Sequence, residues 1–118
     1  MPLFEECSER ELALISRLSC RATPMPGATL SREGEWSRQF VIILDGQASV
    51  YRGERKVDAL GPGDYFGELA LIDEGPPTAT VTVVADTPMR LEVMNRREFR
   101  QLLTDVPSIS GQFLRANP

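Results

Sequence analysis

The residues with the clearest chemical potential lie between Phe66 and Ile72, in the sequence FGELALI. Gly67 permits a tight turn and a close approach of another group to the backbone. We interpret the segment as one or two helical turns between strands, whose first N–H groups have no intrahelical partners and attract an anion. The carboxylate of Glu68 accepts hydrogen bonds. These groups together predict a site in which the amides take a phosphate and Glu68 holds a ligand hydroxyl.

The same residues also have purely structural interpretations. Gly67 alone is typical of a turn, and Glu68 alone complements the positive end of a short helix. Thr78, Thr80 and Thr82 alternate with Ala or Val, which makes them most simply the outward residues of a strand. A ligand role stays open for Thr78.

The chain contains no histidine. Histidine is the commonest general base and the commonest metal ligand, and Ser-His and Cys-His nucleophiles require it. No Asp/Glu pair stands out as an acid–base pair, and Cys7 and Cys20 match no metal-binding spacing. The sequence therefore predicts no catalytic residue, no metal site and no cofactor, and it argues against an enzyme.

Length and composition are those of one globular domain. The chain has 118 residues, of which 42% are hydrophobic and 25% charged, so we expect a single domain over residues 1–118. Its formal net charge of -4 argues against nucleic acid as a partner. No apolar run approaches the ~18 residues of a membrane span, and nothing resembles a signal peptide. We therefore expect a cytoplasmic protein without a membrane span.

Helices are expected near both ends of the chain. Ser8 and Glu11 form a capping box for a helix over residues 9–19. Asn95, with Glu98 three residues on, caps a second helix over residues 96–105, where apolar residues recur at helical spacing.

Strands are expected between the helices, at residues 40–44, 47–51, 56–60, 78–85 and 89–93. Asp45-Gly46 predicts a two-residue hairpin between the first two of these strands, and Gly53-Glu54 predicts a second reversal. The predicted fold class is mainly β: an antiparallel β-roll (jelly roll, double-stranded β-helix) with N-terminal and C-terminal flanking helices.

In this setting, the sequence GPGDYFGELALIDEGPPTATVTV at 61–83 resembles the phosphate-binding segment of the cyclic nucleotide-binding domain family. That family includes catabolite-activator-type regulators and protein kinase A regulatory subunits. Its pattern is roughly F-G-E-[LIM]-A-L, a short loop, then P-R-[AST]-A-[ST]-V. Here FGELAL at 66–71, Pro76 and TATV at 78–81 match, and the resemblance covers nearly the whole chain.

The resemblance implies a role for each matching residue. Glu68 accepts the ribose 2′-hydroxyl of a cyclic nucleotide, cAMP or cGMP. The backbone around Gly67, Leu69 and Ala70 lines the ribose and the cyclic phosphate. Thr78 donates its amide. In the family, ligand binding moves the closing helices, which implies a partner protein or a fused effector domain of unknown identity.

One position departs from the family pattern. The arginine that pairs with the cyclic phosphate falls at position 77, which is Pro77 here. Arginine offers a charged, bidentate fork, whereas proline has neither charge nor N–H. Loss of one partner of a buried charge pair costs about 2–5 kcal/mol, roughly 30- to several thousand-fold in affinity. No residue between Ile72 and Val84 is basic. We therefore expect weakened binding of cAMP or cGMP.

Two functions from different classes stay open. The first is a cyclic nucleotide-binding-type sensory domain, which the intact FGELA sequence at 66–70 favours. The alternative is a ligand-free β-roll that works as a protein-interaction or dimerisation module, as a homodimer or with an unknown partner protein. Pro77 favours this alternative.

Overall fold

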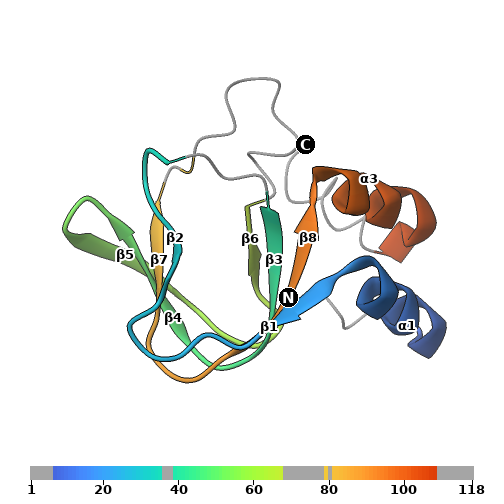
Figure 1. Cartoon of the computed structure of the whole chain (residues 1–118), viewed down its shortest axis with the longest axis horizontal. Coiled ribbons are helices and arrows are strands. Elements are labelled where there is room, and N and C mark those ends of the chain that lie inside the picture. Colours follow the sequence, from blue (N-terminus) through green and yellow to red (C-terminus); the bar gives the residue numbers. More distant parts are fainter. Residues whose placement is uncertain (1–6, 36–38, 68–78, 80, 109–118) are drawn as a thin grey trace.

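The computed structural model describes residues 7–35, 39–67, 79 and 81–108. In this part of the chain, strands form two four-stranded antiparallel sheets, and helices cover the outer face of one sheet (Figure 1). The elements are α1 (Glu9–Leu18), β1 (Cys20–Ala22), β2 (Thr29–Ser31), β3 (Gln39–Asp45), β4 (Ala48–Arg52), β5 (Arg55–Leu60), β6 (Tyr65–Phe66), β7 (Thr82–Ala85), β8 (Arg90–Asn95) and α3 (Arg96–Asp105). The order is β1-β8-β3-β6 in the first sheet and β2-β7-β4-β5 in the second. The predicted β-roll with flanking helices is confirmed.

Strand β3 is buried on both faces, which explains its dense apolar run. Phe40 and Ile42 face the helices and belong to one core cluster, with Met94 of β8 and Phe99 of α3. Val41, which alternates with them, belongs to the second cluster, between the sheets. Successive side chains of a strand point to opposite faces, so one strand serves both cores.

Both helices begin at the capping boxes that the sequence predicts. The Glu11 N–H donates to Ser8 Oγ at 3.1 Å, and the Ser8 N–H donates to Glu11 Oε1 at 3.0 Å. The Glu98 N–H donates to Asn95 Oδ1 at 2.8 Å, with the reciprocal bond at 2.9 Å. The bounds of α3 are those predicted. Helix α1 ends one residue earlier than predicted, because Ser19 is extended.

The predicted hairpin at Asp45-Gly46 is wrong. Strands β3 and β4 flank this dipeptide but belong to different sheets, so the chain turns a corner of the roll there. Gly46 has a φ of 98°, and a Cβ on it would lie 2.6 Å from the Pro88 carbonyl oxygen. The Asp-Gly dipeptide is therefore typical of a tight reversal of the chain here as well. Position 46 requires glycine because the backbone of residue 88 lies so close to it. At Gly53-Glu54 the reversal is a true hairpin between β4 and β5.

Two further boundaries differ from the sequence-based expectation. Phe66 does not begin a helical turn, because it pairs with Val41 as the last residue of β6. The strand expected from Thr78 begins at Thr82, and Ala79 pairs instead with the loop that follows β2. Within the described residues, no helix is long and apolar enough to cross a membrane, and no group of side chains is arranged to hold a metal ion.

Candidate functional site

The described structure frames the candidate ligand-binding segment at its two ends. Gly67 is the last described residue before it, and Ala79 is described just beyond it. Glu68, Leu69, Ala70, Pro77 and Thr78 lie outside the described residues. Their predicted roles therefore remain predictions. The structure describes the two ends of the segment, which we call the frame: Gly67 and Ala79 with their neighbours.

Gly67 leaves β6 in a conformation that requires glycine. Its φ is 94°, and a Cβ built on it would collide with the backbone carbonyl oxygen of Gln39 in β3. The sequence predicts that another group approaches the backbone closely at Gly67, and in the structure that group is the backbone of the neighbouring strand β3. This contact fixes where the candidate segment departs from the first sheet.

Ala79 is held by two backbone hydrogen bonds. Its N–H donates to the carbonyl oxygen of Glu35 at 3.0 Å, and its carbonyl oxygen accepts from the Gly34 N–H at 2.9 Å. This pairing ties the end of the candidate segment to the loop at residues 32–35, which follows β2 in the second sheet.

Glu33 anchors that loop in turn. Its N–H donates to Thr82 Oγ1 at 3.0 Å, and its Oε1 accepts from the Gly53 N–H at 2.8 Å. The first bond reaches the start of β7 and the second reaches the β4–β5 turn. One glutamate thus joins three segments beside Ala79.

The candidate segment therefore connects the two sheets. In Figure 1, β6 ends and β7 begins at the same, upper end of the roll. The two described ends of the segment contact residues far away in sequence: Gly67 lies against residue 39, and Ala79 is hydrogen-bonded to residues 34 and 35. The Phe66 pairing with Val41 holds the first of these ends in register.

An open cavity of about 430 Å³ lies on the inner face of the first sheet. Such a volume lies within the range of small-molecule sites. Its lining comes from β1, β2, β3, β8 and the chain after β1: Ala22, Thr23, Pro24, Thr29, Leu30, Gln39, Val41, Leu91 and Val93. The lining is mostly apolar with a few polar groups, and through Gln39 it adjoins the start of the candidate segment at Gly67. Sequence analysis missed this cavity, because its lining is assembled from distant strands.

Among the described residues, an exposed arginine lies in the loop that holds Ala79. Arg32 begins the loop that holds Ala79, and its Nε lies 3.7 Å from Glu35 Oε1 with both side chains exposed. Such a pair is weak. The Tyr65 ring packs against that of Phe40, with centroids 5.6 Å apart, in the core beneath the helices.

The comparisons with known proteins agree with this geometry. Residues 24–105 match the family model described as the cyclic nucleotide-binding domain. The chain is 39% identical over 117 residues to a cAMP-dependent protein kinase regulatory subunit of Mycosarcoma maydis, covering 92% of this chain and 22% of that protein. It is 36% identical over 94 residues to a CRP-like cAMP-activated global transcriptional regulator of Mycobacterium tuberculosis, covering 75% and 41% of the two chains.

The fold is also that of a solved structure. The crystal structure of the Thermus thermophilus catabolite activator protein superposes with a TM-score of 0.84 at 23% identity. The match covers 98% of this chain and 56% of that one, so this chain spans only part of the relatives it resembles. With a family match across most of its length and the β-roll fold, the chain belongs to the cyclic nucleotide-binding domain family.

Proposed function

We propose that this domain is a cytoplasmic sensor, formed by residues 1–118 as one unit, whose ligand is cAMP or cGMP. Glu68 accepts the ribose 2′-hydroxyl, and the backbone around Gly67, Leu69 and Ala70 lines the ribose and cyclic phosphate. Thr78 donates its amide. The observation that carries the proposal is the FGELAL…TATV pattern at 66–71 and 78–81, in which residue 67 lies against β3 and residue 79 is bonded to the loop after β2.

The names of the relatives support the class of ligand. One is a cAMP-dependent regulatory subunit and another is a cAMP-activated regulator. Both contain more chain than this domain covers, which supports an effector, fused or separate, as the regulated partner. The two free cysteines support a reducing compartment.

The affinity is set by Pro77. Without the arginine fork, the cyclic phosphate loses a charge-assisted partner, which lowers affinity roughly 30- to several thousand-fold. Arg32 lies in the loop whose backbone is hydrogen-bonded to residue 79. We assign to its positive charge the attraction for the cyclic phosphate that remains without an arginine at position 77. Because its side chain is exposed, that attraction is small.

Regulation follows from the packing of β3. Gln39 contacts Gly67, and the next residue, Phe40, packs against Phe99 of α3 with ring centroids 4.6 Å apart. The start of the ligand segment is thus two contacts from the closing helix. If a ligand binds more tightly to one arrangement of these contacts than to another, it shifts α3 toward the position of the favoured arrangement. The size of this shift in population depends only on the difference between the two affinities.

Calorimetric titration of cAMP and cGMP into the 118-residue chain tests the proposal. The unmodified chain should bind weakly, and Pro77→Arg should strengthen cAMP binding by about 2–3 kcal/mol, or roughly 30- to 150-fold. Adding Glu68→Ala to that variant should weaken binding again by removal of the ribose acceptor.

Two results would contradict the proposal. Sub-micromolar binding of cAMP to the unmodified chain would show that Pro77 does not limit affinity. A folded Pro77→Arg variant that binds no nucleotide at millimolar concentration would instead favour the ligand-free interaction module. For that second function the structure offers the edge strand β5, where Val57 is 47% exposed.

A further inference from the structure

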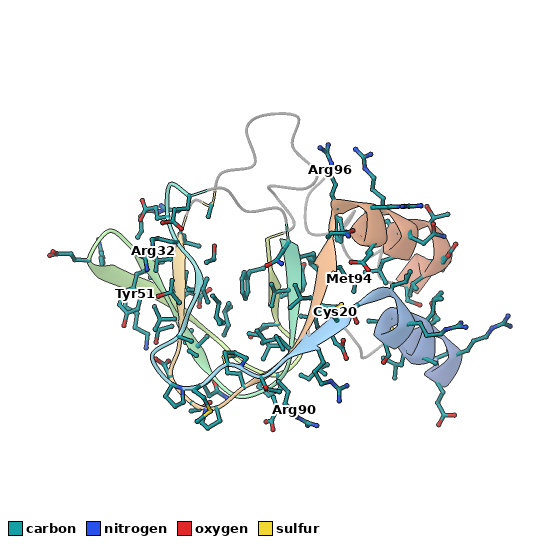
Figure 2. The ribbon with its side chains drawn as sticks, in the orientation of Figure 1. Cys20, Arg32, Tyr51, Arg90, Met94 and Arg96 are labelled. Atoms are coloured by element: carbon teal, nitrogen blue, oxygen red, sulfur yellow. The ribbon has the colours of Figure 1, made fainter. Side chains whose placement is uncertain are left out.

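The outer face of α3 carries a concentrated positive charge. A cavity of about 430 Å³ is lined there by Arg96, Arg97, Arg100, Gln101 and Thr104, which we call the α3 arginine face. Figure 2 shows Arg96 projecting from the start of α3 on the side away from α1. The opposite side of the helix is buried in the core through Phe99, Leu102 and the capping residue Val106.

These charges oppose the dipole of their own helix. The N-terminal end of a helix is its positive end, so arginines at its first positions are unfavourable. Helix α3 begins with Arg96 and Arg97, which outnumber the single acidic residue of its first turn, Glu98; it has no basic residue in its last turn and ends at Asp105. Helix α1 shows the usual arrangement, with acidic residues in its first turn and Arg17 in its last. The stability of α3 therefore does not explain its arginines.

Nothing in the described part of the chain neutralises these arginines. Its ion pairs involve Arg21, Arg32 and Arg90. Gln101 donates instead to Asp105, and Thr104 donates to the Arg100 carbonyl oxygen at 3.1 Å. The described residues therefore contain no carboxylate paired with these three guanidinium groups.

We propose that the α3 arginine face docks an acidic segment of a protein, presenting carboxylates to Arg96, Arg97 and Arg100. Arginine pairs bidentately with carboxylates. The three arginines span little more than one helical turn, about 6 Å along the axis, which matches a short acidic segment. A nucleic-acid duplex is disfavoured, because it extends well beyond the three arginines over a chain whose net charge is -4, whereas a short acidic segment contacts the arginines alone. The proposal does not depend on nucleotide binding.

Amide chemical-shift titration of the full chain with hexaglutamate at about 50 mM NaCl tests it. The shifts should cluster at residues 96–104. The variant Arg96→Gln/Arg97→Gln/Arg100→Gln should bind about tenfold more weakly. The matched control Arg10→Gln/Arg52→Gln/Arg55→Gln removes the same charge from exposed positions elsewhere, and its affinity should stay within about twofold of the unmodified chain.

A thermal unfolding scan separates docking from a structural role. Because Arg96 and Arg97 oppose the helix dipole, Arg96→Gln/Arg97→Gln should raise Tm by about 2–8 °C. A lower Tm for that variant would make the arginines structural and overturn the proposal. Equal loss of hexaglutamate binding in the triple variant and its control would also overturn it. So would larger shifts at residues 96–104 with inorganic phosphate or with a DNA duplex of about 20 base pairs than with hexaglutamate.

Discussion

Replacing Gly67 by alanine tests the frame of the ligand segment. At a φ of 94°, an L-residue with a side chain is strained by about 1–2 kcal/mol. The new Cβ also collides with the Gln39 carbonyl oxygen, a backbone atom that a change of rotamer does not move. This steric clash is removed only if β6 moves away from β3.

The second part of the effect follows from what that parting disrupts. Phe66 loses its pairing with Val41, and the Tyr65 ring loses its packing against Phe40. Contacts of this kind are each worth about 0.5–1.5 kcal/mol. The total destabilisation for Gly67→Ala is about 2–5 kcal/mol, or about 8–20 °C in Tm at roughly 4 °C per kcal/mol.

Gly27 provides a matched control. Its φ is 90°, close to that of Gly67, but a Cβ on it would meet nothing within 4 Å. Gly27→Ala should therefore show the backbone strain alone, about 1–2 kcal/mol. Urea unfolding of both variants measures the difference. Equal destabilisation would refute the contact between Gly67 and β3, and with it the first anchor of the ligand segment.

Two further predictions use the charges of the described residues. Arg32→Ala should weaken residual cAMP binding about two- to fivefold by chemical-shift titration, since an exposed charge contributes about 0.4–1 kcal/mol; Arg52→Ala is the control and should leave affinity unchanged. The backbone N–H of Ser8 holds the pKa of Glu11 below its ordinary value of 4.5, so the stabilisation from the ionised carboxylate is present above pH 4.5 and is lost as pH falls through the lower folded pKa. Glu11→Gln should therefore be less stable than the unmodified chain at pH 7 and nearly equal to it well below pH 4, as urea unfolding at both pH values can show.

The parts of the fold that sequence analysis predicted well are encoded locally. A capping box consists of two residues three apart, so Asn95 and Glu98 are sufficient to place the start of α3. The apolar run at residues 40–44 likewise indicates a strand, which the structure confirms as part of β3. Such signals involve only neighbours in the chain.

The parts that were missed depend on which strands meet. Asp45-Gly46 predicts a reversal, but the sheet that β4 joins is decided by its pairing with β7, far along the chain. The Thr/Val alternation suggested a strand from Thr78, whereas Ala79 bonds to the loop at residues 34 and 35. The cavity was missed for the same reason, since its lining comes together only when distant strands meet.

Strand β3 determines how the two proposed sites relate. Because it is buried on both faces, its alternate side chains belong to the inner cavity, through Val41, and to the helix-side core, through Phe40. Gly67, at the start of the candidate segment, contacts Gln39, the first residue of β3, while Phe99 of α3 packs on the next residue, Phe40. The helix carries its arginines on the face turned away from that core. A partner bound to the arginines therefore leaves the inner cavity uncovered.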